Sequence, residues 1–475
     1  MSSSPYPHRQ RFDLPHAGSG RPVHRLGVIA TVATFGGLLF GYDTGVVNGA
    51  LEPLSQDFGL TALSEGMVVA SLMIGAAFGA VFGGRVADAS GRRRTILLLA
   101  GIFIIGTLGC VLAPGAEFLI GSRFVLGLAV GGASATVPVY LGEIAPSEKR
   151  GSFVTRNELM IVAGQLAAFI INAVIFNVWG HVDSIWRWML LVALLPAIAL
   201  LVGMIFQPES PRWLISKGRT EEALAVLKKV RSPERAEAEV AEVTHLASED
   251  AKQSTGGLTD LGTRWVLRLV IIGAGLGFFQ QLTGINSVMY YGTQLLTNAG
   301  LDSGVAIIGN IANGVFSLAG ISLGMFLLNK LPRRVMFLTG YGLIAVFHTL
   351  IALTAVVVPP GPGQAWTVLV FLVLFVFSMQ GTVGPLTWLM LSEIFPMKIR
   401  SFAMGICVFV LWIMNAVVAQ FFPPLIEAMG MTATFGMFAG FAVIAFIFLY
   451  TLLPETKDKD LAEFEREFKA KYGRK

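Results

Sequence analysis

The chain has 475 residues, of which 54% are hydrophobic and 14% are charged, and its formal net charge is +5. A soluble domain usually carries about a quarter charged residues, so this composition excludes a soluble globular protein. The 54 glycines fit helices that pack closely in lipid, where small residues let backbones approach each other. The small positive charge does not indicate nucleic-acid binding, and we expect no nucleic-acid partner.

Residues 1–25 show no helical period and are expected to form a disordered tail. Twelve apolar stretches follow, and each approaches the roughly 20 residues that one bilayer crossing requires. The expected spans are 26–48, 66–87, 95–113, 118–140, 158–178, 187–206, 266–290, 304–328, 335–357, 366–390, 402–423 and 432–453. The pattern predicts an all-α membrane protein with twelve transmembrane helices in the lipid bilayer.

Two motifs of the first half return in the second half. Glu143-Ile144-Ala145-Pro146-x-x-x-Arg150 returns as Glu393-Ile394-Phe395-Pro396-x-x-x-Arg400, and Gly91-Arg92-Arg93 returns as Pro332-Arg333-Arg334. The repetition predicts two parallel-repeat six-helix bundles. Many secondary transporters have this architecture, with the substrate site between the halves near the midplane.

The expected organisation is therefore a bundle at 26–206, a linker at 207–264, a second bundle at 265–453 and a tail at 454–475. Within the linker, the sequence predicts short amphipathic helices at the membrane surface. Lysine and arginine gather at the termini and in every second loop, and cytoplasmic loops retain such residues. We expect both termini in the cytoplasm. The lack of any Asn-x-Ser/Thr sequon favours a bacterial cytoplasmic membrane.

Few ionisable residues fall well inside the spans, where a charge costs a few kcal/mol. Asp43 lies in the first span and Arg123 in the fourth, and packing of these helices can bring the two together. A buried carboxyl group protonates more readily, while a nearby guanidinium opposes protonation, so the pair can form a proton site. A fixed structural ion pair is the open alternative. His348, in the ninth span, is expected to be a packing residue.

Uncharged polar side chains inside the spans are candidates for substrate contacts. Amides both donate and accept hydrogen bonds, which suits the hydroxyl groups of a neutral polyol, and indole faces pack against a sugar ring. Bonds between helices are the alternative use of such amides. The candidate substrate-binding residues are Gln165, Gln280, Gln281, Asn286, Tyr290, Asn313, Trp388, Trp412 and Asn415.

A third group of residues lies at the expected cytoplasmic helix ends. Acidic and basic side chains can pair there, and such pairs are expected to latch the cytoplasmic ends together when the transporter opens outward. The alternative is that the arginines only set the membrane topology, because cytoplasmic loops retain basic residues. That alternative does not explain the matched Glu143 and Glu393. The candidate gating residues are Asp88, Arg92, Arg93, Glu143, Arg150, Glu209, Arg212, Arg333, Arg334, Glu393, Arg400 and Glu455.

In combination, these motifs resemble the sugar porter family of the major facilitator superfamily, from about residue 26 to residue 467. The motifs are the Gly-Arg-Arg triplet, Pro208-Glu-Ser-Pro-Arg-Trp213, Gln280-Gln-Leu-Thr-Gly-Ile-Asn286 and Pro454-Glu-Thr456. The resemblance implies the twelve-helix fold, alternating access, and sugar contacts from the amides and Trp388. It also implies proton coupling through Asp43 and Arg123.

Some local details are more similar to bacterial inositol carriers, including Gly45-Val-Val-Asn-Gly49 and Leu411-Trp-Ile-Met-Asn415. There are also departures from the family pattern. Asn329 stands where the repeated loop motif has an acidic residue, and Ala89 stands where the first copy usually has a basic one. The second latch is therefore expected to be weaker than the first.

The sequence predicts proton-coupled import of a neutral hexose or cyclic polyol such as myo-inositol, by a protein that we expect to be monomeric. A passive facilitator is the main alternative. A sugar sensor would usually carry a longer cytoplasmic extension. An enzyme is not expected, because no nucleophile, acid–base pair or metal cluster is visible. Cys110 and Cys407 have neither metal-site nor disulfide spacing, so we expect no cofactor or metal.

Overall fold

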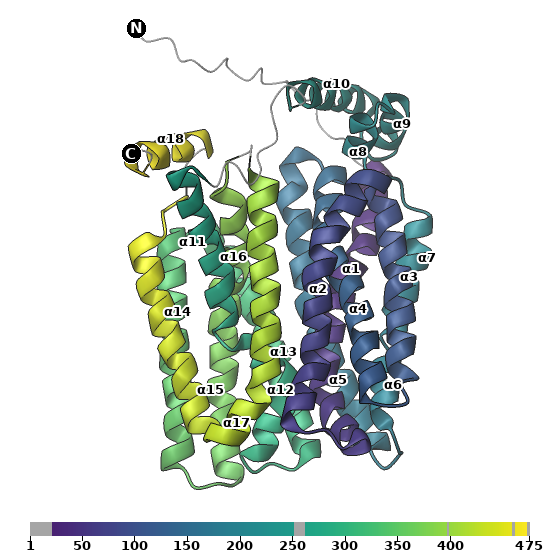
Figure 1. Cartoon of the computed structure of the whole chain (residues 1–475). Coiled ribbons are helices and arrows are strands. Elements are labelled where there is room, and N and C mark those ends of the chain that lie inside the picture. The colour runs from purple at the N-terminus through teal and green to yellow at the C-terminus, as the bar shows by residue number, and fades with distance from the viewer. Residues whose placement is uncertain (1–20, 251–261, 397–398, 458–460, 473–475) are drawn as a thin grey trace.

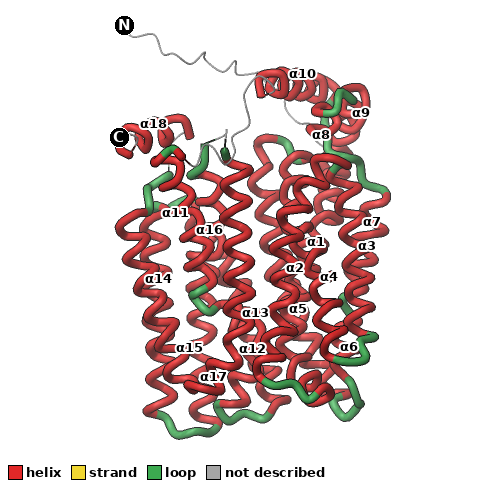
Figure 2. Tube along the Cα trace, viewed as in Figure 1, coloured by secondary structure: helices red, strands yellow, loops and turns green. Residues whose placement is uncertain are grey.

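The structure is a computed structural model that describes residues 21–250, 262–396, 399–457 and 461–472. Regular structure in these residues is helical throughout, and no strand occurs among them. Figures 1 and 2 show two upright helical bundles side by side, with short helices lying across one end. We call that end the linker face and the opposite end the far face.

The first bundle contains every long helix before residue 206. Its helices are α1 (Arg21–Phe58), α2 (Ala62–Ser90), α3 (Arg92–Val111), α4 (Ala116–Ile144), α5 (Arg150–Trp179), α6 (Ile185–Leu191) and α7 (Leu194–Ile205). A short 3-10 turn, Ser147–Lys149, precedes α5. Helix α1 begins at Arg21, so the last five residues of the expected tail, 21–25, are helical; residues 1–20 lie outside the described part.

The second bundle repeats this arrangement with more interruptions. Its helices are α11 (Arg264–Gln281), α12 (Ile285–Asn298), α13 (Ser303–Leu328), α14 (Arg333–Val357), α15 (Pro362–Gly381), α16 (Val383–Glu393) and α17 (Arg400–Leu452). The expected seventh span is divided at Gly284, whose φ of 73° is left-handed and suits glycine. The tenth is divided at Thr382.

The last two expected spans are two helices that meet at a kink and together carry the label α17. Its 53 residues correspond to about 80 Å, well over the roughly 30 Å of a hydrocarbon core. The chain bends at Gly430 (φ 74°, ψ 175°), shortly after Pro423 and Pro424. In Figure 1 the helix turns back at the far face. Eleven described helical stretches are long and apolar enough to span a membrane, and α17 supplies two crossings.

The linker and the C-terminal tail carry shorter helices at the linker face. These are α8 (Pro211–Ser216), α9 (Thr220–Val230), α10 (Pro233–Asp250) and α18 (Leu461–Tyr472). Trp213, Leu214 and Ala223 form a small buried cluster between α8 and α9. Arg231 and Arg235 both pair with Glu239, and Arg231 also donates to the carbonyl of Ile144, at 2.8 Å. The linker is thereby fastened to the end of α4.

Close packing of α1 on α5 depends on glycines spaced four residues apart, at positions 37, 41, 45 and 49. A Cβ at Gly41 would lie 1.7 Å from the backbone oxygen of Ile161, and one at Gly45 would lie 2.9 Å from the Cβ of Ala168. Both distances are too short for any side chain. Asp43 and Asn48 lie between these glycines, on the segment of α1 that packs directly on α5.

Candidate functional site

The two halves are bridged on their far side by the amide of Asn48, on α1. Its Nδ2 donates to the carbonyls of Val288 (3.3 Å) and Met289 (2.8 Å). Its Oδ1 accepts from the backbone N–H (3.0 Å) and the hydroxyl (2.6 Å) of Thr293, and from Nδ2 of Asn310 (2.9 Å). We call this group of five residues the far-face seam. The side chains of Asn48, Thr293 and Asn310 are at most 2% exposed.

Further hydrogen bonds between the halves lie nearby. Ser303 donates to Glu52 at 2.8 Å, and Gln420 donates to the carbonyl of Leu63 at 2.9 Å. Gln294 donates to Glu65 at 3.3 Å. No hydrogen bond or ion pair among the described residues joins the halves at the linker face. The halves are therefore fastened together on the far side of the molecule.

Sequence reasoning did not select Asn48, Thr293 or Asn310. A signal was present for Asn48, because it lies inside the Gly-Val-Val-Asn-Gly motif of the first span. Thr293 and Asn310 lie within polar stretches of α12 and α13 that also serve ordinary helix packing. Only their contact between the halves, which the structure shows, distinguishes these three residues from polar residues that serve ordinary helix packing.

The glutamines and asparagine beside the α11–α12 break lie close together. Asn286 donates to Gln281 Oε1 at 2.7 Å, and Gln281 donates to Gln280 Oε1 at 3.5 Å. The break is held by Thr283, whose hydroxyl donates to the Gln280 carbonyl at 2.6 Å. His348 Nε2 lies 2.7 Å from the Thr283 carbonyl, so this histidine tethers the break to α14.

Four other predicted contacts also point into the interior. Tyr290 and Asn415 lie 3.2–3.4 Å apart through their polar atoms, and each contacts the sulfur of Met73. Gln165 donates to the hydroxyl of Thr44 at 3.2 Å. The Trp412 ring lies 5.5 Å from the ring of Phe40, in the other half.

The last two predicted substrate-binding residues, Asn313 and Trp388, are placed differently from the others. Asn313 donates to Asn310 Oδ1 at 2.8 Å and so belongs to the network of the far-face seam. Trp388 is half-buried on α16, and its indole makes no hydrogen bond to another described residue.

Several buried polar atoms of this region lack a hydrogen-bond partner among the described residues. They include Gln165 Oε1, Asn313 Oδ1 and Trp412 Nε1. Buried polar groups are normally paired. These three come from α5, α13 and α17, so the unpaired donors and acceptors are contributed by both halves. The arrangement suits a ligand that carries hydroxyl groups on several sides.

Asp43 and Arg123 are both 2% exposed but do not form an ion pair with each other. Arg123 Nε donates to the carbonyl of Val68 at 2.8 Å, and its Nη2 has no partner among the described residues. Asp43 Oδ2 likewise has none. The expected meeting of the two side chains is therefore not a direct contact in this structure.

A carboxyl group that sequence reasoning passed over is Glu158, on α5. It is the first residue of the expected fifth span, 158–178. A charged residue at that position is expected at the membrane surface rather than inside the span. Glu158 precedes Gln165 by seven residues, so on an α-helix the two side chains point within about 20° of each other, about 10 Å apart. Glu158 is half-buried. It therefore lies in line with Gln165, toward the linker face.

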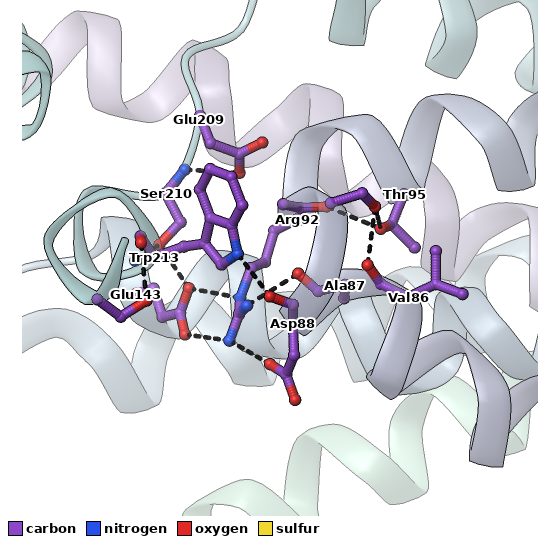
Figure 3. A network of polar contacts seen from close by, with 12 residues as sticks. Val86, Ala87, Asp88, Arg92, Thr95, Glu143, Glu209, Ser210 and Trp213 are labelled. Carbon is purple, nitrogen blue, oxygen red and sulfur yellow. Dashed lines mark hydrogen bonds and ion pairs between the residues drawn. The ribbon is translucent and has the colours of Figure 1, made fainter. Parts of the chain in front are cut away.

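The linker face carries a latch in the first half, shown in Figure 3. Arg92 donates to Glu143 at 3.1 Å and pairs with Asp88 at 2.9 Å. Ser210 donates to Glu143 as well, and Glu209 accepts from the backbone N–H of Arg93 at 3.0 Å. The latch therefore joins α2, α3, α4 and the start of the linker.

The second half repeats this latch. Arg333 donates to Glu393 at 3.2 Å, and Thr456 donates to Glu393 at 2.6 Å. Glu455 accepts from the backbone N–H groups of Arg333 and Arg334, at 3.0 Å each. Asn329 donates to the carbonyl of Met325 at 3.4 Å and, being an amide, forms no ion pair with Arg333. The Arg333 side chain thus has one acidic partner, Glu393, whereas the Arg92 side chain has two, Asp88 and Glu143.

Each latch joins helices of one half, and both are formed while the far-face seam is closed. In this structure they therefore do not depend on outward opening, in contrast to the expectation from the sequence. Arg400 donates to the carbonyl of Phe395 in its own half. Arg212 is exposed on α8 and forms no ion pair with any described residue. The side chain of Arg150 lies outside the described part of the chain.

The family model and the relatives that match this chain are all described as transporters. The model of the family described as "Sugar (and other) transporter" matches residues 29–468. The chain is 48% identical over 453 residues to the major myo-inositol transporter of Bacillus subtilis (strain 168), covering 95% of this chain and 96% of the relative. It is 38% identical to the glucose transporter of Staphylococcus epidermidis, covering 94% and 98%.

Solved structures give the same result. The inward-open conformation of the xylose transporter XylE from E. coli superposes with a TM-score of 0.81 at 29% identity, covering 93% of this chain and 99% of that one. The proton:xylose symporter XylE bound to 6-bromo-6-deoxy-D-glucose gives a TM-score of 0.77 at 30% identity, covering 93% and 99%.

Proposed function

Because the chain belongs to the sugar transporter family, we propose that it imports a neutral hexose or cyclic polyol together with protons, by alternating access. The protein is a multi-pass membrane transporter with the major facilitator fold, not an enzyme. The substrate class is supported most directly by the unpaired atoms of Gln165, Asn313 and Trp412, which are buried and come from both halves. The name of the Bacillus subtilis relative favours myo-inositol among the polyols.

The substrate is neutral on this proposal. Arg123 is the one cationic side chain among the buried polar and charged residues inside the described transmembrane helices, and its Nε is occupied by the Val68 carbonyl. An anionic sugar would need a second buried cation. Amides satisfy hydroxyl groups without charge, because each can donate and accept. Gln280, Gln281 and Asn286, which are already linked, provide the third side of such a site.

The linker face is cytoplasmic on this proposal, since basic residues gather there and cytoplasmic loops retain them. The far-face seam then closes the external side, and the sugar reaches the cytoplasm between the linker-face ends of the two bundles. The similarity to the inward-open XylE structure supports this orientation. Import requires the seam to open and the linker-face ends to approach each other, so that the site faces each side in turn.

Asp43 is the proposed proton carrier, and Arg123 is its electrostatic partner. An ionised Asp43 attracts the guanidinium, whose Nη2 is unpaired. Protonation of Asp43 removes that attraction and leaves Arg123 bonded to Val68, as in this structure. A proton moving inward supplies about 2.3 kcal/mol per 100 mV of membrane potential. That is enough for accumulation of about fortyfold at 100 mV, because 1.4 kcal/mol corresponds to a factor of ten.

The test uses purified protein in lightly buffered liposomes, with myo-inositol or D-glucose added outside and the external pH followed. We expect alkalinisation with one of these sugars, because sugar and proton enter together. Uptake of labelled sugar without a pH change would identify a passive facilitator instead. Absence of uptake with both sugars would overturn the substrate class.

A further inference from the structure

We propose that Asn310 is a positioning residue that couples closure of the far-face seam to the atom that Asn313 presents to the sugar. The inference rests on the proposed function, because it deepens the role of Asn313 in the sugar site. The coupling is supported by a continuous series of hydrogen bonds that runs from α1 and α12 to α13. In this series, the orientation of each amide determines which end the next amide must present.

The series starts at backbone groups, whose roles are fixed. The carbonyls of Val288 and Met289 can only accept, so the amide nitrogen of Asn48 must face them. The Asn48 oxygen then faces Thr293, and the backbone N–H of Thr293, which can only donate, lies 3.0 Å from it. Both ends of the Asn48 amide are thereby oriented by α12.

The orientation passes to α13. Because Asn48 presents an oxygen, Asn310 must present its Nδ2, which lies 2.9 Å from that oxygen and 2.9 Å from the Thr293 hydroxyl. The Asn310 oxygen therefore faces Asn313, whose Nδ2 donates to it at 2.8 Å. Asn313 Oδ1 is left without a partner among the described residues. Asn313 thus has its Oδ1 free to accept from the substrate, while one of the two N–H groups of its Nδ2 is held by Asn310.

The consequence depends on the state of the seam. When α12 moves away from α1, Asn48 loses its two carbonyl partners, and the Asn310 amide loses the oxygen that holds it. Asn313 is then free to present either end of its amide. A sugar hydroxyl that donates to Asn313 Oδ1 favours the closed seam, so sugar binding and closure of the external side stabilise each other.

The first experiment reads seam closure without any ligand. Ser287, on α12, is 1% exposed, and its hydroxyl has no partner among the described residues, so Ser287→Cys removes no hydrogen bond. In a Cys110→Ala, Cys407→Ala background, in lipid nanodiscs, the rate of labelling by a polar thiol reagent reports opening. We expect Asn310→Ala to raise this rate about two- to tenfold, the effect of losing one net hydrogen bond.

Two further variants separate the relay from packing. Asn310→Asp keeps the size of the side chain but places an acceptor against Asn48 Oδ1, so labelling should rise at least as much as in Asn310→Ala. The matched control is Asn172→Ala, which removes a buried amide bonded only within the first half, to the carbonyl of Val46. Unchanged labelling in both Asn310 variants, or an equal rise in the control, would overturn the coupling.

The second experiment measures the effect on the site, with labelled myo-inositol and D-glucose as probes. If Asn310 acts through Asn313, the double variant Asn310→Ala, Asn313→Ala should have the same apparent KM as Asn313→Ala alone. Additive increases in KM would contradict the relay. If neither sugar is taken up by the wild-type protein, the proposed function fails, and the labelling experiment still decides whether Asn310 holds the seam.

Discussion

Arg123 directs its Nε hydrogen bond to the backbone carbonyl of Val68, at 2.8 Å, although Asp43 is equally buried in the same half. No ion pair joins the two side chains in this structure. A permanent structural pair, one of the two readings of the sequence, is therefore not what these residues form here. On the proposed function, the pair forms only when Asp43 is ionised.

We predict that Asp43→Asn abolishes sugar accumulation driven by a proton gradient and preserves sugar counterflow. An amide resembles the protonated carboxyl group in shape but carries no transferable proton, so the conformational change continues without coupling. Both activities are measured with labelled sugar in liposomes, with and without a protonophore. Gradient-driven accumulation at the wild-type level would make Asp43 a structural residue.

We predict that Gln281→Ala raises the KM for sugar about tenfold, because loss of one or two hydrogen bonds costs about 1.4 kcal/mol. The turnover rate should change less, since Gln281 lies beside the α11–α12 break rather than at the seam. The control is Gln207→Ala, which removes only a bond to the Gly203 carbonyl near the linker face. Equal KM values for wild type and Gln281→Ala would remove this residue from the site.

We predict that Glu158→Gln retains sugar affinity and that Glu158→Leu lowers it about tenfold. The reason is that Glu158 points in the same direction as Gln165 on α5, and an amide oxygen still accepts a hydroxyl group. Uptake kinetics of the two variants measure the difference. A large loss in Glu158→Gln would instead indicate that the carboxyl group itself, and its proton, are required.

We predict that Glu143→Gln destabilises the protein by about 1.5–3 kcal/mol, the usual range for a hydrogen bond to a charged group. Glu143 is 15% exposed and accepts from both Arg92 and Ser210. Asp88→Asn should cost less than about 1 kcal/mol, because the Asp88 side chain is 74% exposed. Thermal melting of the purified variants compares them, and the opposite ranking would refute this account of the latch.

We predict that Gly41→Ala lowers the free energy of unfolding by about 1–3 kcal/mol, the cost of overpacking a tight contact. Its Cβ would collide with the backbone oxygen of Ile161, which cannot move without bending α5. Gly101→Ala is the control, since nothing lies within 4 Å of its added Cβ. Similar melting temperatures for the two variants would show that α1 and α5 tolerate separation.

The sequence predicted the spans well, and its errors have physical causes. Hydropathy locates apolar stretches but does not register a break inside one, so the tenth span was expected to be continuous and is divided at Thr382. The last two spans were expected as two helices and are two, separated by the non-helical Gly430. The start of α1 at Arg21 also lies outside the apolar stretch, because helical hydrogen bonding continues beyond the membrane interior. The matched latch residues were visible because each lies in a repeated motif at a helix end.

The sequence by itself determined the membrane architecture, the two repeated halves and the latch partners, because these depend on local composition and on motifs a few residues long. Only the tertiary structure decided that Asn48 meets Asn310, 262 positions away, and that Arg123 bonds to Val68. Such contacts depend on the rotation and tilt of whole helices against each other. Nearly every side chain in a span is apolar, so the sequence gives little indication of which face a helix turns toward its partner.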